Sequence, residues 1–333
     1  MTPRSARGYE NRVSGLPLFD RRLVIVTGKG GVGKSTIAMA MALAAAIRGR
    51  RTLLVELTST GTLSERLGLS RPLRGQPRRV RSNLAACRLD PREALEDFVR
   101  GLMPVKFLAR ALLGSRSFRT VVAAAPGIDE FLALYRLARW EEERQRGSRR
   151  PRYDLIVVDA LATGHSLPLL GAPETFLRMV PVGPFADLAR RLRALVTDRT
   201  RTVVAVLATP EEMAVNEAID LHRHLDQELK LPLAAPIVNA VLPRRWSRAE
   251  EAMIGNGKGI PPEWEPYAAV ARFELARQLA TESHISRLRA SLGTPPLCLP
   301  YVFAKTLTLA TAGPLVDALA AAAADTGDSI EVR

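Results

Sequence analysis

A glycine-rich segment near the start of the chain carries a lysine and two hydroxyl residues at fixed offsets. It reads Gly28-Lys29-Gly30-Gly31-Val32-Gly33-Lys34-Ser35-Thr36 and fits the pattern G-x-x-x-x-G-K-[ST] in full. Glycines let backbone N–H groups turn toward a phosphate chain. Lys34 can then reach the β- and γ-phosphates, and the Ser35 hydroxyl can bind Mg²⁺. The segment therefore predicts a site for ATP with Mg²⁺, and a glycine turn without a ligand is the weaker alternative.

An acid at the end of an apolar run is the second candidate for chemistry. Leu155–Asp159 (LIVVD) has the pattern of a strand buried on both faces. In open α/β sheets, ligands bind at the carboxyl ends of the strands, so we expect the Asp159 carboxylate to orient Mg²⁺ or its water ligands. A helix N-cap is the alternative role for Asp159. His165, slightly further along, can equally pack or cap, and alone it indicates little.

Strands and helices alternate along the chain in the order that such a site needs. Leu23–Thr27 predicts a buried strand before the loop, and Ser35–Arg48 predicts a helix after it that Gly49 ends. Further predicted strands are Thr52–Leu57, Leu84–Leu89, Leu155–Asp159, Thr202–Ala208, Pro236–Val241 and Pro296–Pro300. Further predicted helices begin at Pro91, with Asp90 as N-cap, and cover Ile128–Glu143, Glu211–Leu229, Glu265–Leu292 and Thr311–Ala324. Pro173–Val196 is also predicted to be helical, with breaks at Pro181, Gly183 and Pro184. Arg71–Arg81 is predicted to be a surface loop. The alternation predicts an α/β fold with a doubly wound, mostly parallel sheet.

Composition excludes several classes of protein. The net charge is +14, but the 42 Arg and 6 Lys are scattered, which indicates codon usage and argues against a nucleic-acid-binding stripe. The two cysteines, Cys87 and Cys298, are far apart and form no CxxC, which argues against a zinc site and a disulfide scaffold. The N-terminus has no secretory pattern, and the longest apolar run, Ile37–Ile47, is shorter than the roughly 20 residues of a membrane span. We therefore expect a cytoplasmic protein, and peripheral membrane contact stays open.

The loop and several other segments resemble one family. Lys29 directly after Gly28 gives K-G-G-x-G-K-[ST], which is typical of the deviant Walker-A class of phosphate loops. Together with PGIDE (Pro126–Glu130), DALATGH (Asp159–His165) and IVNAVLP (Ile237–Pro243), it resembles the arsenical-pump (ArsA-like) ATPases. That family includes the guided-entry ATPase that targets tail-anchored membrane proteins. The matching segments run in family order over about residues 21–320.

The resemblance implies a dimer of identical or paralogous chains with two nucleotides at the interface. It implies that Lys29 reaches the partner's nucleotide and that Asn239 contacts the adenine through its amide. It also implies one P-loop ATPase domain over residues 21–325, with tails at 1–20 and 326–333. Within that domain, a helical subdomain at about 91–125 and 174–198 is expected to move with the nucleotide state.

The chain departs from the family at several positions. Where the family has an Asp that positions the attacking water, Thr58 stands here, and a hydroxyl is a poor base at neutral pH. Glu56 is nearby but two residues earlier. Hydrolysis is therefore expected to be slow, or to need an acid from a partner chain. The alternative is a hydrolysis-deficient paralogue that regulates a catalytic partner. Ala162 replaces a proline, and the arsenite-binding thiols and the zinc-binding CxxC are missing, so metalloid transport is not inherited.

An apolar set of residues after Pro91 has two interpretations. The residues could form an exposed groove that binds a helical segment of an unknown protein client. Alternatively, they form the apolar stripe of a helix that is buried in the core, which is the interpretation that we favour. The set comprises Phe98, Leu102, Met103, Val105, Phe107, Leu108, Leu112 and Leu113. A partition-type ATPase on DNA is a third functional reading, suggested only by the net charge.

Overall fold

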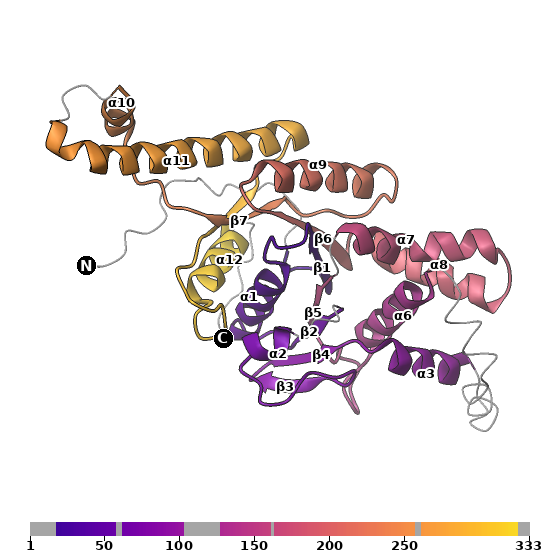
Figure 1. Ribbon diagram of the computed structural model, residues 1–333. Helices are drawn as coiled ribbons and strands as arrows, with labels where there is room; N and C mark the ends of the chain where they lie inside the picture. The colour runs from indigo at the N-terminus through magenta and orange to yellow at the C-terminus, as the bar shows by residue number, and fades with distance from the viewer. Residues whose placement is uncertain (1–17, 58–61, 103–126, 161–162, 257–260, 326–333) are drawn as a thin grey trace.

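The computed structural model describes residues 18–57, 62–102, 127–160, 163–256 and 261–325 (Figure 1). Eight strands form one sheet in the order β3-β4-β2-β5-β1-β6-β7-β8. All neighbours are parallel except β3 and β4. The strands are β1 (Leu23–Gly28), β2 (Thr52–Glu56), β3 (Arg78–Arg81), β4 (Leu84–Arg88), β5 (Leu155–Asp159), β6 (Thr202–Ala208), β7 (Ile237–Val241) and β8 (Leu297–Pro300). The predicted doubly wound, mostly parallel sheet is confirmed.

Strand β3 lies inside the segment that we predicted to be a loop, so that prediction was wrong. Its residues are exposed apart from the half-buried Val80, so the sequence lacks the alternation of apolar and polar residues that predicts a strand. It forms instead by antiparallel pairing with β4 at the edge of the sheet. The seven predicted strands are all present, with ends that agree to within a residue.

Helices cover both faces of the sheet. They are α1 (Lys34–Ile47), α2 (Thr62–Arg66), α3 (Pro91–Leu102), α6 (Ile128–Glu142), α7 (Thr163–Met179), α8 (Pro184–Thr197), α9 (Glu212–Gln227), α10 (Arg248–Asn256), α11 (Glu265–Leu292) and α12 (Gly313–Asp325), with a 3₁₀ turn at Pro262–Trp264. Helix α1 packs on β1, β2 and β5 and against α12, while α7, α8 and α9 contact β1 or β6 (Figure 1). Strands β1, β2, β5 and β6 are therefore buried along their whole length.

The breaks predicted within Pro173–Val196 are confirmed, because two helices, α7 and α8, meet there. Helix α7 begins earlier and contains Pro168 and Pro173, whereas we had taken Pro173 as a helix start. Gly183, at φ +89°, separates α7 from α8. The N-cap at Asp90 is confirmed, because its Oδ1 accepts a hydrogen bond from Arg92 N at 2.8 Å.

The start of the helical subdomain packs as core. Phe98 of α3 is 5% exposed and meets Phe131 and Tyr135 of α6 edge-on. The core interpretation therefore holds for Phe98, while Met103 to Leu113 and the side chain of Leu102 lie outside the described residues. The predicted bounds of the subdomain and of the terminal tails stay predictions. No helix among the described residues is long and apolar enough to cross a membrane.

Candidate functional site

The glycine-rich loop joins the buried end of β1 to the start of α1. At Gly28, φ is +145° and a Cβ would lie 2.3 Å from the carbonyl oxygen of Leu207 on β6. Gly33 is the N-cap of α1, with φ +92°. Both positions therefore need glycine. Because β1 lies between β5 and β6, the loop and the N-terminus of α1 meet at the carboxyl edge of the sheet, where free helix N–H groups favour an anion.

Lys34, the first residue of α1, lies on the inner side of the loop. It is 9% exposed, and its Nζ donates a hydrogen bond to the carbonyl oxygen of Lys29 at 2.9 Å. Burial lowers the pKa of the Lys34 ammonium, and the nearby Asp159 carboxylate opposes that shift. The side chain is thus folded over the loop and faces the end of β5.

Asp159 is fully buried at the carboxyl end of β5. Neither of its carboxylate oxygens has a hydrogen-bond partner of ordinary geometry among the described residues. Burial is the main reason that the Asp159 pKa is raised to about 6, and the Ser35 hydroxyl is close enough to act in the opposite direction. A buried carboxylate without a partner is costly, and a carboxylate beside a hydroxyl suits Mg²⁺. The donor set therefore fits a magnesium ion held with substrate phosphates.

Lys29 lies on the outer side of the loop. Its Nζ forms an ion pair with Glu217 Oε1 of α9 at 2.9 Å, and the two side chains are 28% and 39% exposed. Lys29 is therefore held by its own chain near the surface, whereas Lys34 is buried. Its predicted contact with a partner's nucleotide stays a prediction.

Asn239 of β7 contacts the loop directly. Its Nδ2 donates a hydrogen bond to the carbonyl oxygen of Val32 at 2.9 Å, and a Cβ on Gly33 would lie 2.4 Å from that nitrogen. Asn239 thus supports the loop from β7, which β6 separates from β1 in the sheet. The predicted contact of its amide with adenine stays a prediction.

Three residues near the loop were not predicted as part of the site. Glu56, at the end of β2, is fully buried and lies in register with Asp159. Arg66 of α2 donates from Nη1 to the Thr36 hydroxyl at 3.0 Å and to the Leu307 carbonyl oxygen at 3.3 Å. Glu217 is the third. Strand order brings Glu56 to the loop, and helix packing brings Arg66 and Glu217.

Two other predicted features fall partly outside the described residues. Thr58 and Ala162 lie outside them, and His165 is described only through the backbone of α7. The structure brings Asp159 of β5 and Asn239 of β7 to the loop segment that contains Lys29, Lys34 and Ser35. No group of three or more His, Cys, Asp or Glu side chains within the described ranges could hold a metal ion without further ligands.

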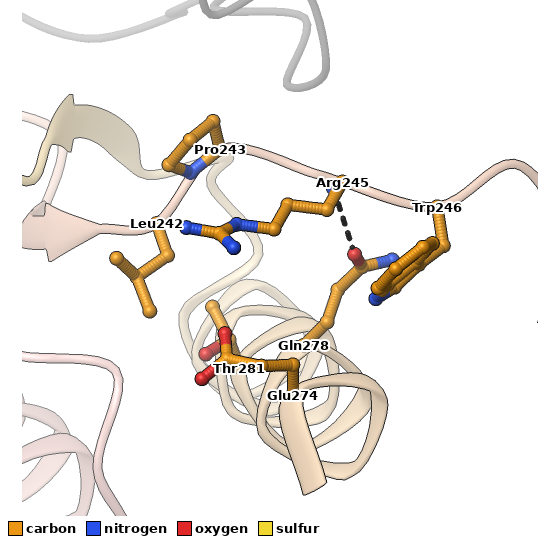
Figure 2. Close-up of a pocket in the computed structure, with 7 residues that line it drawn as sticks. All are labelled: Leu242, Pro243, Arg245, Trp246, Glu274, Gln278 and Thr281. Atoms are coloured by element: carbon orange, nitrogen blue, oxygen red, sulfur yellow. Dashed lines mark hydrogen bonds between the residues drawn. The ribbon is translucent and has the colours of Figure 1, made fainter. Parts of the chain in front are cut away.

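A small pocket lies away from this site, between the segment after β7 and helix α11 (Figure 2). It is lined by Leu242, Pro243, Arg245, Trp246, Glu274, Gln278 and Thr281. Arg245 N donates to Gln278 Oε1 at 3.0 Å across it. Its volume of about 10 Å³ has room for about one water molecule, so it does not compete with the loop as a nucleotide site.

Comparison with known proteins identifies relatives of this chain. The sequence profile of the family "Anion-transporting ATPase" matches residues 21–182, which include the loop, β2 and β5. The chain is similar to "ATPase BagA" of Mycobacterium tuberculosis, with 28% identity over 261 residues that cover 76% of this chain and 74% of the relative.

Arsenical pump-driving ATPases are also similar. The one from Acidiphilium multivorum is 29% identical over 275 residues, which cover 70% of this chain and 44% of that protein. The one from Escherichia coli is 28% identical over 270 residues, with the same 70% and 44% coverage. The chain thus spans less than half the length of these two pump proteins.

Proposed function

Because residues 21–182 of this chain belong to the anion-transporting ATPase family, we propose that the chain binds ATP with Mg²⁺ at Gly28–Thr36 and hydrolyses it to ADP and phosphate. One observation carries the proposal. Asp159 is fully buried, has no hydrogen-bond partner of ordinary geometry among the described residues and lies beside the Ser35 hydroxyl in the first turn of the helix that follows the loop. This is the arrangement that a magnesium nucleotide needs.

The residues of the loop and its neighbours have distinct roles in the proposed reaction. The glycines let backbone N–H groups approach the phosphates, and Lys34 neutralises charge on the β- and γ-phosphates. Ser35 and Asp159 hold the metal or its water ligands. Mg²⁺, when bound, neutralises charge on the phosphate oxygens and orients them. Asn239 keeps the loop in shape through Val32.

We further propose that two subunits use this reaction as a switch. ATP binding closes a dimer in which Lys29 leaves Glu217 and reaches the nucleotide of the partner subunit. Hydrolysis then reopens the dimer, and the helical subdomain passes the change to a protein client. The exposed apolar side chains of Met179, the last residue of α7, and of Val180 and Val182, which precede α8, support a contact surface for that client.

Phosphate release and nucleotide binding test the proposed reaction. Wild-type protein is expected to release phosphate from ATP only with Mg²⁺ present. Asp159→Asn is expected to lose most of this activity and the Mg²⁺ dependence of nucleotide binding measured by calorimetry. Asp187→Asn changes an exposed carboxylate at the start of α8 and is the matched control. Metal-independent ATP binding in wild type, or full activity in Asp159→Asn, would contradict the proposal.

A regulatory subunit without turnover of its own is the second candidate function. Thr58 favours it, because a threonine stands where the family has the Asp that positions the attacking water. This candidate predicts nucleotide binding with negligible hydrolysis by the purified chain. Turnover would then appear on addition of a paralogous subunit, or in the variant Thr58→Asp. Hydrolysis by the wild-type chain alone would rule it out.

A further inference from the structure

Two acids lie side by side at the carboxyl edge of the sheet. Strands β2 and β5 are parallel neighbours, and Glu56 is the register partner of Asp159. Adjacent strands are about 4.8 Å apart, and register partners project from the same face of a sheet. Both side chains are fully buried. The two carboxylates therefore share one enclosed space beneath the phosphate loop.

This enclosed space also contains cationic groups. The Glu56 charge raises the pKa of Asp159, whereas the Lys34 ammonium and the Arg66 guanidinium lower it. Each of these three charged groups is thus close enough to Asp159 to act on it. Two buried carboxylates that lie close together are costly unless cations compensate them, and the Ser35 hydroxyl is the hydrogen-bond donor beside Asp159. A divalent cation near the two acids would add to the compensation that Lys34 and Arg66 supply.

We propose that Glu56 is the second acid of the magnesium site, and that it accepts a hydrogen bond from water bound to the metal that Asp159 and Ser35 hold. This inference rests on the proposed function and adds a residue to it. Mg²⁺ in proteins keeps several of its waters, which need acceptors of this kind. Partners of the metal ligands commonly change metal affinity about 10- to 100-fold.

The contacts of Glu56 are compatible with this role. Its Oε1 accepts a hydrogen bond from Leu63 N at the start of α2, at 3.1 Å. A carboxylate has about four acceptor positions on its two oxygens, so the bond from Leu63 does not by itself exclude a water ligand.

Manganese binding tests the inference without relying on turnover. The probe is Mn²⁺ titrated into the full chain with saturating AMP-PNP, and free Mn²⁺ is measured by electron paramagnetic resonance. Glu56→Gln keeps an oxygen acceptor for Leu63 N and removes only the charge. It is expected to weaken Mn²⁺ binding about 10-fold or more, while AMP-PNP binding in EDTA stays at least as tight. Glu65→Gln, exposed on α2, is the matched control and should bind Mn²⁺ like wild type.

The outcomes separate this inference from the proposed function. Glu56→Gln is expected to fold, with a metal-free Tm no lower than that of wild type, because it removes a charge from beside Asp159. Wild-type Mn²⁺ affinity in Glu56→Gln, with a clear loss in Asp159→Asn, would overturn the role of Glu56 alone. Unchanged affinity in both variants would overturn the metal site itself. If Glu56→Gln fails to fold, Glu56→Asp takes its place, and unchanged Mn²⁺ affinity there would overturn the inference.

Discussion

The two lysines of the phosphate loop lie in opposite surroundings. Lys34 is buried, donates a hydrogen bond to the Lys29 carbonyl oxygen and lies near Asp159, which is in register with Glu56; we call Lys34 and these two acids the inner side of the loop. Lys29 is partly exposed and paired with Glu217, and we call this pair the outer side. The inner side is formed by the strands of the central sheet. The outer side is a surface ion pair between the loop and a helix.

In the proposed dimer, the inner side belongs to the nucleotide site of a single chain, whereas the ion pair of the outer side must break when a second chain binds. Ion pairs between partly exposed side chains contribute about 0.2–1 kcal/mol, so Lys29 can leave Glu217 at little cost. Removing a buried charged group of the inner side leaves its partners uncompensated, which costs far more. We therefore expect substitutions on the inner side to abolish chemistry in each subunit, and those on the outer side to affect how subunits combine.

The largest expected effect belongs to Lys34→Ala on the inner side. Without the ammonium, charge on the β- and γ-phosphates is not neutralised, and the rate of hydrolysis should fall about 10³-fold. Phosphate release at saturating ATP measures it. Lys305→Ala, at an exposed lysine, is the control and should keep wild-type activity. An activity within a few-fold of wild type in Lys34→Ala would show that the inner side is not the catalytic one.

Lys29→Ala should have the next largest effect and a different signature. We expect ATP affinity close to wild type and hydrolysis about 10²-fold lower, because one charge near the partner's nucleotide is lost. In wild type, activity per chain should rise with protein concentration as dimers form. That rise should be absent in the variant. Weaker ATP binding by the isolated variant chain would instead assign Lys29 to the inner side.

Gly33→Ala should distort the loop that carries both lysines and so lower the stability of the protein. An alanine would adopt φ +92° and meet Asn239 Nδ2, so we expect a loss of about 1–2 kcal/mol in the free energy of unfolding. Denaturant titration measures it. Gly293→Ala, another glycine with positive φ and with no atom near its Cβ, separates backbone strain from the contact. Equal losses in both variants would mean that the contact with Asn239 contributes nothing.

The sequence allowed the prediction of the inner side better than of the outer side, for a physical reason. The loop pattern is local, and Asp159 ends a buried run, so both could be placed from neighbouring residues alone. Glu56 lies beside Asp159 only because β2 and β5 are adjacent in the sheet, and Arg66 contacts Thr36 only because of where α2 packs. Neighbouring residues in the sequence determine neither arrangement.

Features without an apolar pattern escaped prediction as well. Strand β3 consists mainly of exposed arginines, so only its pairing with β4 shows that it is a strand. Glu217 lies on an ordinary amphipathic helix, and nothing in the spacing of its neighbours singles it out as the partner of Lys29. Prediction from sequence is thus strongest where one segment determines its own structure, and weakest where two distant segments meet at the surface.

The smallest expected effect tests the outer side most directly. Glu217→Gln releases Lys29, so ATP-dependent dimerisation should become about two- to five-fold tighter at low salt, which matches a pair contributing up to about 1 kcal/mol. Glu228→Gln, on the exposed pair with His224 just beyond α9, is the control. Sedimentation at several concentrations measures the dimer. In about 1 M salt the difference should vanish, because the screening length falls to about 3 Å. A weaker dimer in Glu217→Gln would mean that Glu217 itself contacts the partner subunit. The Lys29–Glu217 ion pair would then stabilise the dimer, and the proposal that it competes with dimer formation would be wrong.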